Sequence, residues 1–209
     1  MGMDEWEAQH EAAREEYERE VEQRTLSEIK ENAINYYFFY YGDDIQDRIR
    51  KRIDAAKELA TSGFYGESLT SSMIAVELTI RWFLLRPLCE ASFMSEDVAD
   101  ILVRQILPSR SGGADRDLLP KMLKEWGTDI TSLELSDGSE LWESVTKQFI
   151  VSRNRFIHRG ETVERETAEG AVDAAERLLT EAIRIVTLFA RRGEDGWAPT
   201  KCRRTIENM

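Results

Sequence analysis

Apolar residues recur at steps of three and four along most of the chain, and this spacing predicts helices. The clearest segment runs from about residue 65 to Arg86, where Pro87 should end the helix. Its predicted core face consists of Leu69, Met73, Val76, Ile80, Phe83 and Leu84. A second long helix is predicted from about residue 165 to 191, and small residues on its buried stripe should permit close helix contact. That stripe comprises Ala168, Ala171, Val172, Ala175, Leu178, Leu179, Ala182, Ile185 and Phe189.

Four further helices are predicted between and beside these two. They are residues 45 to 61, 96 to 107, 117 to 126 and 139 to 157. Ser95 is a suitable N-cap for the second of them, and Pro108 should end it. The glycine-containing stretch 109 to 113 and the polar stretch before Gly138 should be loops. The pattern therefore predicts an all-α fold without a sheet.

The N-terminal region is predicted to form two accessory helices. Residues 4 to 23 carry a thin stripe of Trp6, Ala13, Tyr17 and Val21 on an otherwise charged helix. A second helix should run from about residue 26 through six consecutive aromatics at 36 to 41 and stop at Gly42. Six aromatics cover every side of a helix, so one core cannot bury them all. We interpret the run as core plus a partner surface, with base stacking as the alternative.

Length and composition favour one helical domain with appendages. The chain has 209 residues, and we divide it into accessory helices at 1 to 42, a bundle at 43 to 191 and a flexible tail at 192 to 209. Cys89 and Cys202 form neither a disulfide framework nor a zinc motif, which suits a reducing cytosol. No signal peptide or membrane span is expected, because the N-terminus is acidic and no run approaches about 20 apolar residues.

The distribution of charge directs attention to one short segment. The net charge of -12 argues against a protein that coats nucleic acid, so any RNA contact must be local. Residues 1 to 23 hold nine acids and two arginines, whereas residues 150 to 160 hold three arginines and no acid. The acidic arm either keeps the protein soluble, which we favour, or mimics RNA and covers the basic segment.

The basic segment has an unusual arrangement on a helical wheel. Arg153 falls inside the apolar arc formed by Trp142, Val145, Phe149, Ile150, Phe156 and Ile157. An arginine there must be paired or face a ligand, because an unpaired buried charge costs several kcal/mol. Asn154 and His158 lie one turn apart, so the amide can hydrogen-bond the imidazole, and Gly160 should end the helix just beyond them.

These residue types suit cleavage of RNA by its own 2'-hydroxyl. An imidazole moves protons near neutral pH, and guanidiniums hold and neutralise a phosphate, so the chemistry requires neither metal nor cofactor. A histidine with a purely structural role is the simpler alternative for His158. Arg155 and Arg159 are candidate RNA contacts or ordinary solvated arginines.

The segment from Arg153 to His158 resembles the Arg, four to six residues, His motif of the HEPN superfamily, with the frequent Asn directly after the Arg. Residues 55 to 85 resemble the family's first helix pair, and residues 162 to 179 its closing helix. The resemblance implies an HEPN-like four-helix bundle, here with extra N-terminal helices and an inserted short helix. It also implies a homodimer in which two motifs face one cleft.

Carried over by residue, the resemblance makes His158 the proton-transfer residue, Arg153 the phosphate contact and Asn154 the residue that orients them. Gly160 stands where toxins paired with a nucleotidyltransferase antitoxin have a tyrosine, so inhibition through that tyrosine is not expected. Glu77 and Arg81 are a supporting pair. They form an internal salt bridge, or Glu77 crosses the bundle to Arg153 or His158 and tunes the site.

We therefore expect a cytoplasmic, metal-independent endoribonuclease of the HEPN type, acting as a toxin or anti-phage defence effector. Its expected partners are RNA, a second copy of the chain, and an antitoxin or defence protein, with no membrane. The alternative is a catalytically inactive HEPN dimer that serves as an adaptor or a nucleotide- or ligand-binding module. A DNA-binding regulator is disfavoured because no basic recognition helix is evident.

Overall fold

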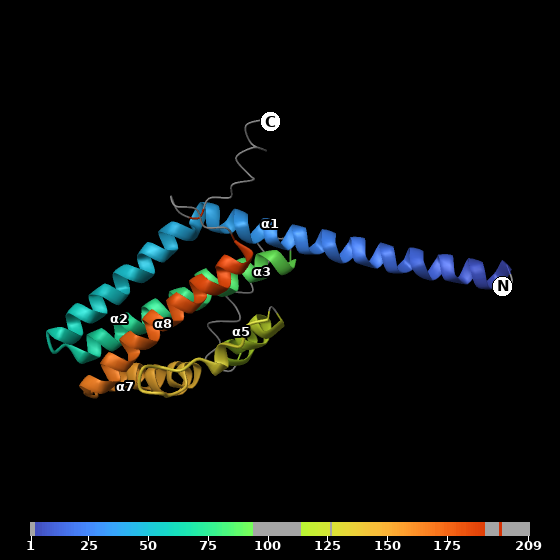
Figure 1. Cartoon of the computed structure of the whole chain (residues 1–209). Coiled ribbons are helices and arrows are strands. Elements are labelled where there is room, and N and C mark those ends of the chain that lie inside the picture. The colour runs from blue at the N-terminus through green and yellow to red at the C-terminus, as the bar shows by residue number, and fades with distance from the viewer. Residues whose placement is uncertain (1–2, 94–113, 126, 191–196, 198–209) are drawn as a thin grey trace.

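The computed structural model describes residues 3–93, 114–125, 127–190 and 197, and most of these residues are helical (Figure 1). The described residues contain no strand, apart from an isolated bridge between Glu134 and Glu140. The all-α prediction is thus confirmed for these residues. The predicted helix at 96 to 107 and the loop after it lie outside them.

The first 59 described residues form one helix, α1 (Met3–Thr61), where three separate helices were predicted. The predicted stop at Gly42 is wrong. A Cβ atom added at Gly42 would lie 2.7 Å from the Trp197 ring and 2.9 Å from the Phe38 ring. The glycine therefore makes room for a tryptophan from the far end of the chain instead of ending the helix.

Figure 1 shows that the N-terminal half of α1 extends well beyond the other helices and that α1 changes direction partway along. Tyr17 and Val21 in the extended part are 67% and 44% exposed. The side chains of Trp6 and Ala13 lie outside the described residues. The described members of the predicted stripe therefore face solvent in the single chain.

The second long helix consists of α2 (Tyr65–Leu78), the π-helical segment η1 (Thr79–Leu85) and α3 (Arg86–Phe93) without a break. Its predicted core residues are confirmed as buried, with Ile80 partly buried against the core. The predicted end before Pro87 is wrong, because the helix continues through this proline.

Local hydrogen bonding explains how the helix accommodates Pro87. In the π-helical segment the Arg86 N–H donates to the carbonyl of Arg81, five residues earlier. The same pattern would join the nitrogen of residue 87 to the carbonyl of Trp82, but proline has no N–H. The Tyr37 hydroxyl donates to this carbonyl instead, at 2.7 Å. Burial raises the pKa of Tyr37 and so keeps its hydroxyl protonated as a donor.

Small polar side chains join α1 to α2. The Ser68 hydroxyl donates to the Ala56 carbonyl at 2.8 Å, and the Ser71 hydroxyl donates to the Arg52 carbonyl at 2.9 Å. Because serine is short, these bonds form only where the two backbones approach closely. They fix the position of Arg52 on α1 relative to α2.

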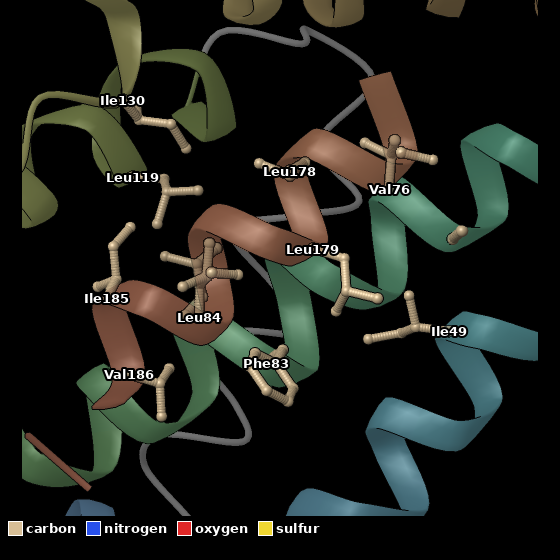
Figure 2. Packing of buried hydrophobic residues seen from close by; sticks show 14 of the residues in the cluster. Ile49, Val76, Phe83, Leu84, Leu119, Ile130, Leu178, Leu179, Ile185 and Val186 are labelled. Carbon is tan, nitrogen blue, oxygen red and sulfur yellow. The ribbon is translucent and has the colours of Figure 1, made fainter. Parts of the chain in front are cut away.

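The core lies where α8 (Arg165–Phe189) packs on α2 and on the C-terminal half of α1. Figure 2 shows Leu178 and Leu179 of α8 with Val76 and Ile49, and Leu119 and Ile130 closing the core from the other side. The described members of the predicted α8 stripe, from Ala168 to Ile185, are buried as predicted. Its alanines keep the interhelical distance short.

The C-terminal part of the domain brings the basic segment onto this core. It contains α5 (Ala114–Glu125), η2 (Ile130–Ser132) and a continuous helix made of α6 (Leu141–Glu143), η3 (Ser144–Phe149) and α7 (Ile150–Arg159). Gly160 ends α7 with a φ of +66°, in the left-handed region that favours glycine. This helix end was predicted and is confirmed.

Trp197 lies within the range that we predicted as a flexible tail, yet it is buried. Its ring contacts Phe38 and Phe83, and its indole N–H donates to the Gln46 side chain at 3.2 Å. This residue therefore corrects the tail prediction at position 197, and the remainder of the tail lies outside the described residues.

The stretch Tyr65–Ala91 is long and apolar enough to cross a membrane by length and composition, because it contains an 18-residue window with a mean hydropathy of 1.2. The sequence pattern predicted no such run. In the structure 61% of this window is buried against other parts of the protein. A core helix has the same properties, so this finding alone does not place the helix in a membrane.

Candidate functional site

A close contact between an α7 side chain and the α2 backbone helps to hold α7 against α2. Gly66, in the first turn of α2, is buried, and a Cβ atom added to it would lie 2.1 Å from the Phe156 ring. The ring of Phe156 therefore occupies the space that a side chain at position 66 would fill. This contact sets the position of the motif residues on both sides of Phe156.

Arg153 of α7 pairs with Glu77 of α2. Its Nη1 lies 2.9 Å from the Glu77 carboxylate, and the two side chains are 25% and 36% exposed. Of the two interpretations of Glu77, the structure shows the contact across the bundle to Arg153. The Arg153 Nε is buried and has no hydrogen-bond partner in the described part of the chain. The guanidinium is thus anchored by Glu77, and a quarter of the Arg153 side chain remains exposed.

The other predicted site residues face solvent. Asn154, Arg155, His158 and Arg159 are all exposed on α7. Within the described residues no hydrogen bond joins the Asn154 amide to the His158 imidazole, so the predicted orienting contact is not present in the single chain. Arg159 makes a loose ion pair with Glu161 at 3.7 Å. The structure therefore brings Arg153 and Glu77 together and leaves Asn154, Arg155, His158 and Arg159 exposed on α7, while Arg81 is half-buried on the π-helical segment after α2.

A groove of about 340 Å³ lies directly beside the motif. Ile157 and Phe156 of the motif form one side, Arg52 of α1 forms the other, and Ile74 and Thr70 of α2 lie between them. Sequence reasoning did not identify Arg52. The available signal was the cluster of four basic residues at positions 48, 50, 51 and 52, which is close to the motif only after folding.

Two large apolar side chains of α7 are exposed beside the polar ones. Val151 is 38% exposed and Ile157 is 46% exposed, whereas Ile150 of the same helix packs partly buried against the core. Solvent-facing apolar residues next to functional polar ones are typical of surfaces that bind a partner. Val151 and Ile157 are therefore available for contact with a ligand or a partner.

Among the described residues, no group of three His, Cys, Asp or Glu side chains is placed to hold a metal ion. Comparison with protein-family models, curated proteins and solved structures finds no match to this chain.

The arrangement supplies the components of anion chemistry. Arg153 is held in position by Glu77 and by the packing of Phe156, and it offers a planar set of donors to a phosphate. His158 lies in the last turn of the same helix and is open to solvent, where an imidazole can exchange protons. A ligand that contacts both residues must lie along the exposed edge of α7.

Proposed function

We propose that the protein is a metal-independent endoribonuclease of the HEPN type. The observation that carries this proposal is the pairing of Arg153 with Glu77. It holds a partly buried guanidinium against α2, on the same helix as the exposed His158. A quarter of the Arg153 side chain remains exposed, and this part can bind a phosphate while the carboxylate of Glu77 holds the rest in place. We assign the bundle's four helices to the C-terminal half of α1, α2, the helix ending in α7, and α8.

The proposed reaction is transesterification within the RNA. The His158 imidazole removes the proton of a 2'-hydroxyl, whose oxygen forms a bond to the adjacent phosphorus as the bond to the 5'-oxygen breaks. A protonated imidazole supplies a proton to the departing 5'-oxygen. Arg153 stabilises the charge that develops on the phosphate oxygens. The products are a 2',3'-cyclic phosphate and a free 5'-hydroxyl.

A homodimer would complete this site. Two copies that pack through the Val151 face of α7 bury exposed apolar surface and bring a second His158 to the cleft. One imidazole then acts as base and the other as acid. Asn154 and Arg155 lie on the exposed part of the same helix, where they can contact the partner or the RNA. Arg159 extends the basic surface at the end of the helix.

The proposed biological role is that of a cytoplasmic toxin or anti-phage defence effector that disables RNA and is restrained by a partner protein. This role follows from the HEPN resemblance. The requirement for restraint follows from the chemistry, because a site that needs only its own side chains is active wherever RNA is present.

The second candidate function is a catalytically inactive dimer that serves as an adaptor or ligand-binding module. One observation favours it: four aromatics of the run at 36 to 41 are exposed on α1, namely Tyr36 at 57%, Phe39 at 41%, Tyr40 at 50% and Tyr41 at 47%. Such a concentration of exposed rings suits a docking surface for another protein. The proposed catalytic site makes no use of it.

Cleavage of total cellular RNA in the presence of a chelator separates the two candidates. The wild-type protein should degrade RNA and leave DNA intact, and His158→Ala should lose nearly all activity, because a positioned proton-transfer group contributes about 10²- to 10⁴-fold. His10→Ala is the matched control, since His10 is the other histidine of the chain. The adaptor would be supported if folded His158→Ala degraded RNA as fast as wild type, or if the wild type degraded no RNA.

A further inference from the structure

The groove beside the motif has the size and lining of a nucleotide subsite. Its volume of about 340 Å³ lies within the range of small-ligand pockets, about 300 to 1,000 Å³. Ile74, Phe156 and Ile157 give it apolar surfaces against which a flat base can pack. Two of these three residues belong to the motif itself, so a base in the groove would be joined to a phosphate near Arg153.

The groove has one cationic side. Arg52 lies on α1 opposite the motif, its side chain is exposed, and it makes no ion pair within the described residues. The backbone of Arg52 is held in place by the hydrogen bond that its carbonyl accepts from the Ser71 hydroxyl. A chain with a net charge of -12 thus presents an arginine beside the motif, where a phosphate joined to the bound base would lie.

The polar groups on the α2 side of the groove accept hydrogen bonds. Glu67 offers a carboxylate, which in its ionised form accepts hydrogen bonds and has none to donate. The Thr70 hydroxyl donates its proton to the Gly66 carbonyl at 2.9 Å, so its remaining lone pairs can only accept. A base with an exocyclic amino group complements these acceptors. Uracil presents a carbonyl oxygen at the corresponding position and is repelled by a carboxylate.

We propose that this groove binds the nucleotide next to the scissile phosphate and selects cytosine or adenine over uracil. Glu67 and Thr70 accept hydrogen bonds from the amino group, the apolar surfaces hold the base, and Arg52 binds its phosphate. This inference rests on the proposed ribonuclease function, and it gives that function a substrate preference.

The test uses DNA oligonucleotides that contain a single ribonucleotide and so have one cleavable bond. The bases on the two sides of that bond are varied between cytosine and uracil, which are nearly equal in size. At one of the two positions the wild type should prefer cytosine by about tenfold or more in kcat/KM. Glu67→Gln should abolish or reverse this preference, because an amide can donate to the uracil oxygen. Glu58→Gln, an exposed acid of α1 outside the groove, should retain it.

Arg52 has a separate signature. Arg52→Ala should raise KM about tenfold for both bases and leave kcat nearly unchanged, because a charged hydrogen bond to phosphate contributes to binding. Arg50→Ala is the matched control, since Arg50 lies two residues away and faces α8. An unchanged KM in Arg52→Ala would remove Arg52 from the subsite.

Different experimental results would contradict the groove inference and the proposed function. Equal use of cytosine and uracil by an active wild type, or a preference unaffected by Glu67→Gln, overturns the groove and leaves the ribonuclease in place. If the wild type does not cut RNA, binding of cytidine 3'-monophosphate against uridine 3'-monophosphate decides the groove alone. A light-scattering mass that falls to one chain in Ile157→Asp would show that a second copy occupies the groove, which also overturns the inference.

Discussion

At the scale of single residues, the site depends on how Arg153 is held. The sequence placed Arg153 inside an apolar arc and predicted that it must be paired or face a ligand, and the structure shows the pairing, with Glu77. The sequence alone could not decide which arginine pairs with Glu77. Arg81, one helical turn away, and Arg153 on α7 would each supply the positive charge that the carboxylate needs. Tertiary packing made this choice, through a contact between residues 76 positions apart.

We predict that Arg153→Lys loses about as much activity as Arg153→Ala, about 10²-fold or more in kcat. An ammonium lacks the planar fork that can bind Glu77 and a phosphate at the same time. Steady-state kinetics on a single-ribonucleotide substrate measures this effect. Full activity in Arg153→Lys would show that only the charge matters.

Glu77→Gln should lower kcat about tenfold by releasing Arg153, but reduce the free energy of unfolding by only about 1 kcal/mol or less, because the pair is partly exposed to solvent. Glu176→Gln, which breaks the exposed ion pair with Lys57, is the matched control and should leave kcat unchanged. Urea unfolding and kinetics on the same samples separate the two effects.

At the scale of helices, the sequence predicted the elements whose apolar residues follow a simple period. The buried faces of α2 and α8 and the end of α7 at Gly160 are confirmed. The errors fall at Gly42 and Pro87, where local rules predict a stop. Partners distant in sequence override those rules: Trp197 packs on Gly42, and Tyr37 satisfies the carbonyl that Pro87 leaves free.

Gly66→Ala should displace α7, since the added Cβ would fall 2.1 Å from the Phe156 ring. We expect a loss of about 1 to 3 kcal/mol in the free energy of unfolding, together with a fall in cleavage, because the motif moves with Phe156. Gly170→Ala is the control, since its Cβ would lie 3.3 Å from the Phe149 ring. Thermal unfolding measures both variants, and equal melting temperatures would contradict the account.

The loop from 133 to 140 is held on α8 by Asp173. Its carboxylate accepts from the Ser136 N–H at 2.8 Å and from the Arg177 Nε at 3.1 Å. Burial acts to raise the pKa of Asp173, but the bonds from Ser136 and Arg177 outweigh it and lower the pKa below its ordinary value. The contribution to stability is therefore present above the ordinary pKa, about 4, and is lost as the pH falls through the lowered value.

Asp173→Asn should consequently be less stable than wild type at pH 7, and the difference should shrink as the pH falls below about 4. Urea unfolding across this pH range measures it. The exposed Asp43→Asn serves as control. A difference that grows toward acid pH would show that the carboxylate is destabilising.

At the scale of the whole molecule, the sequence described the charge of the N-terminal arm but not its geometry. One continuous helix carries the arm beyond the other helices, and its described apolar residues Tyr17 and Val21 face solvent (Figure 1). Two accessory helices were predicted, at 4 to 23 and from about residue 26 to a stop at Gly42, where the structure has one helix through residue 61. Because the arm projects away from the other helices (Figure 1), its described side chains do not cover the motif.

Deletion of residues 1 to 23 should therefore leave RNA cleavage within a few-fold of wild type and keep the light-scattering mass at two chains. The described part of the segment contributes no buried side chain, and its acids favour solubility. A large gain in cleavage would instead establish autoinhibition by an acidic mimic of RNA.

The chemical identity of the cleaved ends tests the central claim most directly. The full-length protein is incubated in chelator with an oligonucleotide that has one cleavable bond, and the masses of the fragments are measured by mass spectrometry. Wild type and His10→Ala should yield a 2',3'-cyclic phosphate and a 5'-hydroxyl, and His158→Ala, shown to be folded, should yield neither. Cleavage by His158→Ala at the wild-type rate, or cleavage that appears only after a divalent metal is added, would contradict the account.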